Sequence, residues 1–416
     1  MLKNISITFA SKLLIAVLNL LVVILLSRYL GPFGKGQASL VLTSVTLFLI
    51  ACNVVGGATL VYLVPRFSMK SLLLISYCWT IFSCGIVFVF IHLLHLLPTA
   101  FELPVLILSI LDSFFSINTT ILLGKEKIKT VNTLYFMKAF LVACILFLFL
   151  TVFKTQTVNA YVYTLYVSFS LVFLLSSIFV LQIKVSDEAN KNIREVLNYC
   201  LKLGGINQFG HILQFASLRL SYYLLNHFSK EGELGIYSNG VSLAEAVWLI
   251  SNSVATVQYS KIANSDNTEK SVKLTVDLAK TSLLICLAAV IVMAALPTSF
   301  YTALFGPEFA NVKQVIYTLI PGVFFYNTAL IVGHYFSGIG KYQVEVWGNG
   351  AGLVVTLVLS LFALAQGYSS MWAGIISSVS YIVTTAVIVF YFRKYHQIQP
   401  SALLPSLSDL KKLIRF

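Results

Sequence analysis

Charged residues are scarce in this sequence. Asp, Glu, Lys and Arg make up 10% of its 416 residues, whereas a soluble domain carries about 25%. Hydrophobic residues make up 58%, and the mean hydropathy is +0.89. So few charges do not cover a water-facing surface, and the chain is therefore predicted to be an integral membrane protein.

The signatures of soluble catalytic and metal-binding domains are also absent. The sequence has no P-loop, no HExxH and no GxSxG motif. Its six cysteines show neither CxxC nor Cys/His spacing. They are Cys52, Cys78, Cys84, Cys144, Cys200 and Cys286. We therefore expect no enzyme, no cofactor, no metal site and no ATP-driven step in this chain.

What the sequence has instead is long apolar runs. A helix that spans the hydrocarbon core needs roughly 20 apolar residues, and about twelve runs fit that length. The first ends at Ser27-Arg28-Tyr29 rather than at a small-residue cleavage site, so it is predicted to be retained. The runs lie near residues 8–27, 37–63, 71–96, 103–123, 131–153, 160–183, 203–227, 235–259, 276–298, 314–337, 346–366 and 369–392.

The predicted fold is an all-α membrane protein of two six-helix lobes. Residues 1–183 form the N-terminal lobe and residues 202–393 the C-terminal lobe, joined by a polar cytoplasmic linker at 184–201. In the tail, 394–416, leucines recur at helical spacing. This pattern fits either an amphipathic helix on the membrane surface or a solvated end.

Basic residues orient the helices. The formal net charge is +13, and most Lys and Arg residues fall in alternate loops, which places both termini in the cytoplasm. Because these residues are scattered between apolar runs, they predict no nucleic-acid partner.

The two halves repeat at an offset of 199 residues. Leu26-Ser27-Arg28-Tyr29 aligns with Leu225-Asn226-His227-Phe228, and Pro98-Thr99-Ala100-Phe101 aligns with Pro297-Thr298-Ser299-Phe300. Because each half has an even number of helices, the repeat is parallel. Two such lobes around a central cleft are typical of transporters.

Polar residues inside the apolar runs are costly and usually face a cavity or another polar group. The run at 203–227 has a broad polar face, and the first run has a narrower one. Together they predict a hydrated cleft, and its expected lining and substrate-binding residues are Lys12, Asn19, Arg28, Asn207, Gln208, His211, Gln214, Arg219 and Tyr222.

Four polar positions, Arg219, Glu245, Asp112 and His211, have more than one interpretation. Arg219 and Glu245 lie at similar depth on consecutive helices, so they form a structural ion pair, serve substrate or ion coupling, or do both. Asp112 is expected to bond to a neighbouring helix or to serve coupling. His211 is a hydrogen-bond donor or a proton carrier. Lys138 is expected to extend its side chain to the membrane surface.

Several segments resemble Wzx-type polysaccharide flippases of the multidrug/oligosaccharidyl-lipid/polysaccharide exporter superfamily. The resemblance lies in the run from Leu26 to Gln37, in Leu234–Ser238 with Ser242–Trp248, in Leu304–Phe309 and in Leu319-Ile320-Pro321-Gly322. It implies ion-gradient-driven, alternating-access flipping of an undecaprenyl-pyrophosphate-linked oligosaccharide, an O-antigen, capsule or exopolysaccharide unit, across the bacterial inner membrane. It also implies that polymerase and chain-length proteins of the same pathway are partners.

Other functions remain open alternatives. Drug/cation exporters of this superfamily usually carry acidic residues in the first helix, where this chain has Lys12 and no acidic residue. Lipid II flippases usually have two additional helices. A membrane-embedded glycan polymerase or acyltransferase usually needs a large extramembrane loop, and every loop here is short.

Overall fold

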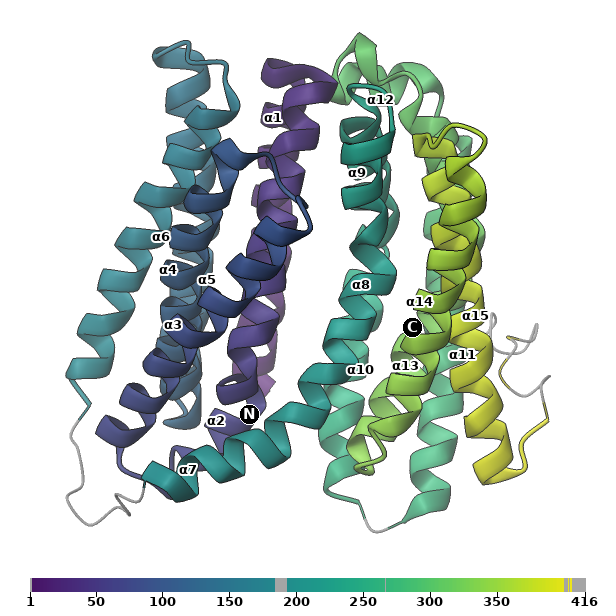
Figure 1. Cartoon of the computed structure of the whole chain (residues 1–416). Coiled ribbons are helices and arrows are strands. Elements are labelled where there is room, and N and C mark those ends of the chain that lie inside the picture. The colour runs from purple at the N-terminus through teal and green to yellow at the C-terminus, as the bar shows by residue number, and fades with distance from the viewer. Residues whose placement is uncertain (1, 184–192, 266, 400–402, 404, 406–416) are drawn as a thin grey trace. The chain divides into compact units, whose positions relative to one another are not determined.

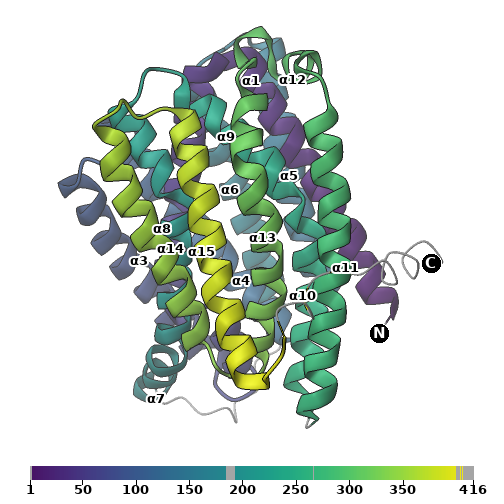
Figure 2. The ribbon, with the colours of Figure 1, turned by 90° about the vertical axis from the view of Figure 1, so that its right-hand side faces the viewer.

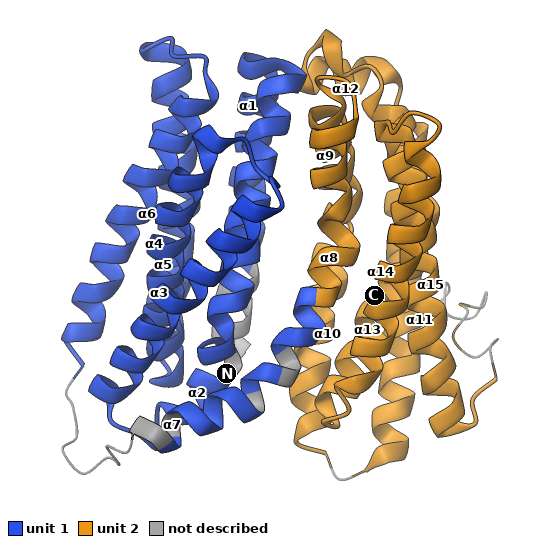
Figure 3. Ribbon diagram, viewed as in Figure 1, with its two compact units in different colours: residues 1–212 blue, residues 213–416 orange. Residues whose placement is uncertain are grey.

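A computed structural model describes residues 2–183, 193–265, 267–399, 403 and 405. Almost all of these residues are helical, and none of them lies in a strand (Figure 1). The chain divides into two compact units, residues 1–212 and 213–416 (Figure 3).

Unit 1 is a bundle of long helices in which α1 packs against α3, α4 and α5. A short helix, α7, and a π-helical turn, η3, lead into α8. The elements are α1 (Leu2–Cys52), η1 (Asn53–Val55), α2 (Gly57–Leu63), α3 (Met69–Leu93), α4 (Thr99–Gly124), α5 (Ile128–Phe147), η2 (Leu148–Val152), α6 (Val158–Leu181), α7 (Ile193–Tyr199) and η3 (Cys200–Gly204).

Unit 2 is built around α13, which packs against α9, α10, α11 and α15 (Figure 2). Its first helix, α8, begins in unit 1. The elements are α8 (Gly205–Phe228), α9 (Glu233–Ala246), α10 (Trp248–Ala263), α11 (Thr268–Ala295), α12 (Thr298–Phe305), η4 (Pro307–Phe309), α13 (Val312–Gly338), α14 (Gln343–Leu364) and α15 (Ser370–His396).

Two local breaks explain how the helices relate to the twelve apolar runs. Gly31 interrupts α1 with a φ of 65°, a conformation that favours glycine, and Pro32 begins the next helical stretch. Val247 separates α9 from α10, which meet at a bend of 46°. Dividing α1 at Gly31 and treating α9 with α10 as one bent path gives six long helical segments in each unit.

Hydropathy alone recognises fewer spans. Nine described helices are long and apolar enough to cross a membrane, or ten if α9 and α10 form one span. That count takes α1 as one helix and leaves out α8, whose polar face lowers its hydropathy. The run at 203–227 is therefore the least membrane-like of the twelve by composition.

The internal repeat coincides with equivalent helix starts. Pro98 is the N-cap of α4, and Pro297 is the N-cap of α12. In unit 1 the helix continues without interruption, whereas in unit 2 α12 and η4 precede α13. This insertion explains why the sequence register between the halves slips after this point.

A buried asparagine occupies related positions in both units. Asn118 on α4 accepts a hydrogen bond from Tyr77 on α3 (2.6 Å) and donates to Ser176 on α6 (3.1 Å). Asn327 on α13 exchanges hydrogen bonds with Ser282 on α11. Each asparagine thus links the fourth long segment of its unit to the third.

The expected linker is partly helical. Residues 193–199 form α7, and Tyr199 makes a ring contact with Phe67 at 6.2 Å. Cys200 belongs to the apolar core that contains Leu60 and Leu72. Residues 193–200 therefore pack against unit 1. Linker residues 184–192 lie outside the described residues, as does most of the tail, 394–416.

Helix packing in unit 2 depends on small residues. At the crossing of α13 with α15, Gly322 lies so close to Ser378 that an added Cβ would be 2.4 Å from the Ser378 Cα. The Gly322 amide donates to the Ser378 hydroxyl at 2.6 Å. This close approach is typical of membrane helices, whose association depends on packing and hydrogen bonds.

Candidate functional site

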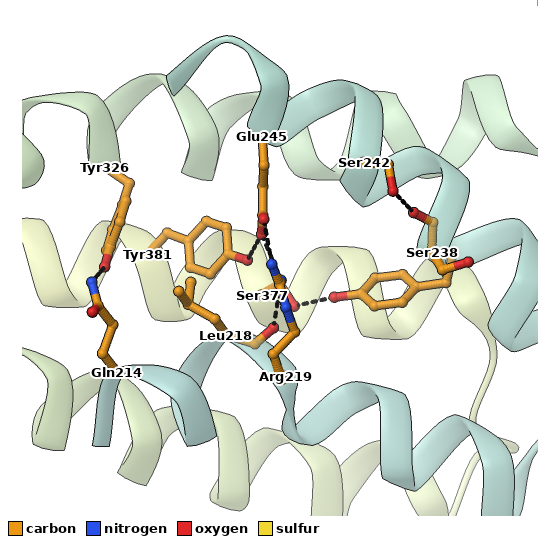
Figure 4. A network of polar contacts seen from close by, with 10 residues as sticks. Gln214, Leu218, Arg219, Ser238, Ser242, Glu245, Tyr326, Ser377 and Tyr381 are labelled. Atoms are coloured by element: carbon orange, nitrogen blue, oxygen red, sulfur yellow. Dashed lines mark hydrogen bonds and ion pairs between the residues drawn. The ribbon is translucent and has the colours of Figure 1, made fainter. Parts of the chain in front are cut away.

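The centre of the candidate site is an ion pair between Arg219 on α8 and Glu245 on α9 (Figure 4). The guanidinium donates through Nη1 to Oε1 at 2.8 Å and through Nη2 to Oε2 at 2.6 Å. Both carboxylate oxygens are thus engaged, which is the strongest geometry for this pair of groups. The ion pair expected from the sequence is therefore formed.

The ion pair is not fully enclosed. The Arg219 side chain is 25% exposed and the Glu245 side chain 16%. Arg219 is thus partly open, and Glu245 is the one carboxylate bound to it among the described residues.

Aromatic side chains surround the pair. Tyr381 on α15 donates its hydroxyl to Glu245 Oε1 at 3.1 Å. The Tyr222 ring centre lies 5.5 Å from the Arg219 guanidinium carbon, within cation–π range. These contacts hold the carboxylate and the guanidinium from two sides.

A three-ring cluster continues from Tyr381. Trp248 lies 5.6 Å from Tyr381 and 4.8 Å from Tyr326, measured between ring centres. The Trp248 indole donates to the Val323 carbonyl at 3.0 Å, and Gln214 Nε2 donates to the Tyr326 hydroxyl at 3.0 Å. The cluster joins α8, α10, α13 and α15 beside the ion pair.

The α9–α10 break positions two of these groups. Glu245 precedes Val247 and Trp248 follows it, so the 46° bend lies between the carboxylate and the indole. A change in this bend would therefore move Glu245 relative to the aromatic cluster. On the other side of the ion pair, Tyr237 shares a hydrogen bond of 2.7 Å with Ser377 of α15.

In unit 1, Asp112 on α4 pairs with Lys138 on α5. The Lys138 ammonium also lies 4.3 Å from the centre of the Phe169 ring on α6. The expectation that Lys138 extends to the membrane surface is therefore wrong. A buried carboxylate on the adjacent helix attracts the ammonium more strongly than the distant interface does. Asp112 does bond to a neighbouring helix, as expected.

The remaining predicted residues divide between the two units. Lys12, Asn19 and Arg28 are exposed on α1, and His211 is exposed on α8. Gln208 is buried, and the Asn207 side chain lies outside the described ones. The structure brings together Gln214, Arg219, Tyr222 and Glu245 within unit 2. A common lining with the unit 1 residues stays a prediction.

Sequence reasoning missed Tyr237, Tyr326 and Tyr381 as members of the site. All three are at most 3% exposed inside membrane helices. A phenolic hydroxyl in such a place needs a hydrogen-bond partner, and that requirement is the signal that would have singled them out. Among the described residues, no group of three or more His, Cys, Asp or Glu side chains could hold a metal ion.

Comparison with known proteins gives a clear result for the fold. No protein-family model and no curated protein sequence matches the chain. Among solved structures, a lipid II flippase MurJ in an inward closed conformation is similar, with a TM-score of 0.72 at 14% identity. The match covers 98% of this chain and 91% of that one. The chain therefore shares the fold of this structure.

Two further solved structures have a similar fold. An inward-facing multidrug resistance MATE family transporter of the MOP superfamily has a TM-score of 0.69 at 14% identity, covering 92% of this chain and 94% of that one. A MOP superfamily transporter from Pyrococcus furiosus has a TM-score of 0.64 at 14% identity, covering 95% of each chain. The predicted multi-pass, all-helical membrane fold is thereby confirmed.

Proposed function

We propose that this protein flips a polyprenyl-pyrophosphate-linked oligosaccharide across the bacterial cytoplasmic membrane by ion-driven alternating access. The observation that carries the proposal is the partly exposed Arg219, bound by both oxygens of Glu245 within a membrane helix bundle. The planar guanidinium suits phosphate oxygens as well as carboxylate oxygens. A pyrophosphate can therefore replace Glu245 as its partner.

The other site residues have complementary roles in this proposal. Lys12, Arg28 and His211 add positive charge toward an anionic substrate, and Gln214 and Tyr222 offer hydrogen bonds to sugar hydroxyls. Asn19, Asn207 and Gln208 have the same hydrogen-bonding chemistry. The O-antigen, capsule or exopolysaccharide class of glycan, and the polymerase and chain-length partners, belong to the proposal on the basis of the sequence resemblance.

Among the coupling candidates, Glu245 is favoured. Its partner Arg219 is 25% exposed, and release of that partner would leave the carboxylate free to take up an ion. Asp112 is held by Lys138 under the Phe169 ring, which favours a structural role. His211, an exposed imidazole on α8, is the second candidate.

Flipping of a fluorescent polyprenyl-pyrophosphate glycan in proteoliposomes tests the proposal. Because charge-assisted hydrogen bonds contribute about 1.5–3 kcal/mol, Arg219→Ala should slow flipping about tenfold or more. Arg219→Lys should retain part of the activity because it keeps the charge. Arg66→Ala is the matched control, since Arg66 is exposed and contacts Tyr62 on α2.

Three results would overturn the proposal. Normal flipping per folded Arg219→Ala molecule, with only the folded yield lowered, would make Arg219 structural. Glycan elongation without flipping would indicate a polymerase. Transport of cationic dyes in place of the glycan would indicate a drug antiporter, a function that the absence of an acidic residue in the first part of α1 disfavours.

A further inference from the structure

A small open hollow lies at the C-terminal end of α15, the helix drawn in yellow in Figure 2. Its volume is about 360 Å³. It is lined by Phe390, Arg393, Lys394, Gln397, Ile398 and Gln399. Two cations, two amides and one aromatic ring therefore share a small concave surface.

The chain turns back on itself to form this hollow. Gln397 has a φ of 52°, which ends α15. The Ile398 carbonyl then accepts a hydrogen bond of 3.2 Å from Arg393 Nε. This contact fixes one edge of the guanidinium and leaves its two terminal nitrogens without a hydrogen-bond partner among the described residues.

Among the described residues, no carboxylate forms an ion pair with Arg393 or Lys394. The sequence has no Asp or Glu between Glu345 and Asp409. A third cation, Lys341, lies 3.8 Å from the centre of the Tyr395 ring, one residue beyond Lys394. The end of α15 therefore attracts an anion that enters from outside the described chain.

Exposed aromatic rings adjoin the cations. Phe390 is 57% exposed and Tyr395 is 50% exposed, at the end of a helix that is apolar enough to span a membrane. Such rings are typical of the boundary between acyl chains and headgroups. Basic residues beside aromatic residues at that depth form a known kind of phospholipid site.

We infer that this hollow binds the phosphate headgroup of an anionic phospholipid. Arg393 and Lys394 contact the phosphate oxygens, Gln397 and Gln399 bond to the headgroup hydroxyls, and one acyl chain packs along Phe390. A lipid fits better than a soluble phosphate because the aromatic side of the hollow requires an apolar partner. This site is independent of the proposed transport function.

Native mass spectrometry of the full chain in detergent with phosphatidylglycerol or phosphatidylcholine tests this inference. Each cation near an anionic lipid gives about a fivefold gain in affinity, so Arg393→Gln/Lys394→Gln should bind phosphatidylglycerol about 30-fold more weakly. Arg393→Lys should stay within a few-fold of the original protein. Lys261→Gln/Lys270→Gln is the matched control, because it removes the same charge from exposed positions at the α10–α11 turn.

Three results would overturn the inference. They are equal binding of phosphatidylcholine, an equal loss in the control, and displacement of the lipid by millimolar inorganic phosphate, which would indicate a soluble anion. If the double variant does not fold, Lys394→Gln alone tests the site, because the Lys394 side chain is exposed. That variant should bind phosphatidylglycerol about fivefold more weakly.

Discussion

Two ion pairs of the same chemistry have different surroundings in this protein. Asp112 and Lys138 are 10% and 21% exposed and lie against aromatic rings of unit 1. In the second pair, both carboxylate oxygens of Glu245 bind the Arg219 guanidinium, beside the α9–α10 break. The first pair has one available role, joining α4 to α5, whereas the second lies where a helix bend can separate its partners.

The role of the first pair is testable by removing one charge. Lys138→Met should leave Asp112 buried without a partner and destabilise the protein by about 3–5 kcal/mol. Adding Asp112→Leu should restore much of the lost stability, because no unpaired buried charge then remains. Thermal unfolding in detergent measures both changes, and flipping per folded molecule should be unaffected. A double variant as unstable as Lys138→Met alone would contradict this account.

Sequence reasoning placed Arg219 and Glu245 correctly because they lie on consecutive antiparallel helices, where depth follows from residue count. It did not find Tyr381, which contacts Glu245 from a helix 136 residues later in the chain. It also assigned Lys138 to the membrane surface, because the rotation of α5 toward α4 is set by packing and not by depth. Residue depth was therefore predictable, and helix rotation was not.

At the scale of helices, the α13–α15 crossing depends on Gly322. A Cβ at this position would lie 2.4 Å from the Ser378 Cα and 2.8 Å from its carbonyl oxygen. Because backbone atoms cannot move aside as a side chain can, Gly322→Ala should destabilise the protein by about 1–3 kcal/mol.

Gly85→Ala is the matched control for this prediction. Gly85 lies within α3, and an added Cβ there would have no atom within 4 Å. The control should be neutral or stabilising by up to about 1 kcal/mol, since alanine is the better helix former. Equal thermal shifts for the two variants would show that the close crossing at Gly322 does not limit stability.

The order of helices was predictable, but their breaks were only partly so. Pro98 and Pro297 are both N-caps, and the offset of 199 residues that aligned them reflects equivalent helix starts. Gly31 followed by Pro32 also marks a recognisable break. The bend at Val247 has neither glycine nor proline, and the adjacent Trp248 ring packs 4.8 Å from the Tyr326 ring. A break without such a residue is not visible in sequence.

At the scale of the whole molecule, the fold is shared with MurJ and MATE transporters at 14% identity. The bilayer explains why so little identity is sufficient. Helix length is set by membrane thickness, and any apolar side chain serves on a lipid-facing surface. The sequence pattern therefore predicts the helices and their order, whereas substrate choice depends on the few polar residues inside the bundle.

The orientation of the molecule in the membrane is a prediction that rests on charge. The turn between α10 and α11 is flanked by Lys261, Lys270 and Lys273, whereas the turn between α8 and α9 has Lys230 alone. Because basic loops remain in the cytoplasm, Asn264 should face inward and Lys230 outward, with both termini inside.

Single cysteines at these two turns test the orientation in a variant whose six cysteines are replaced. A membrane-impermeant maleimide should label Lys230→Cys in intact spheroplasts, and Asn264→Cys only after the membrane is permeabilised. Both turns are exposed, so the difference in labelling reports the side of the membrane and not burial. If Asn264→Cys alone were labelled in intact spheroplasts, the predicted orientation would be wrong. The Lys-rich turn between α10 and α11 would then face outward, against the charge rule.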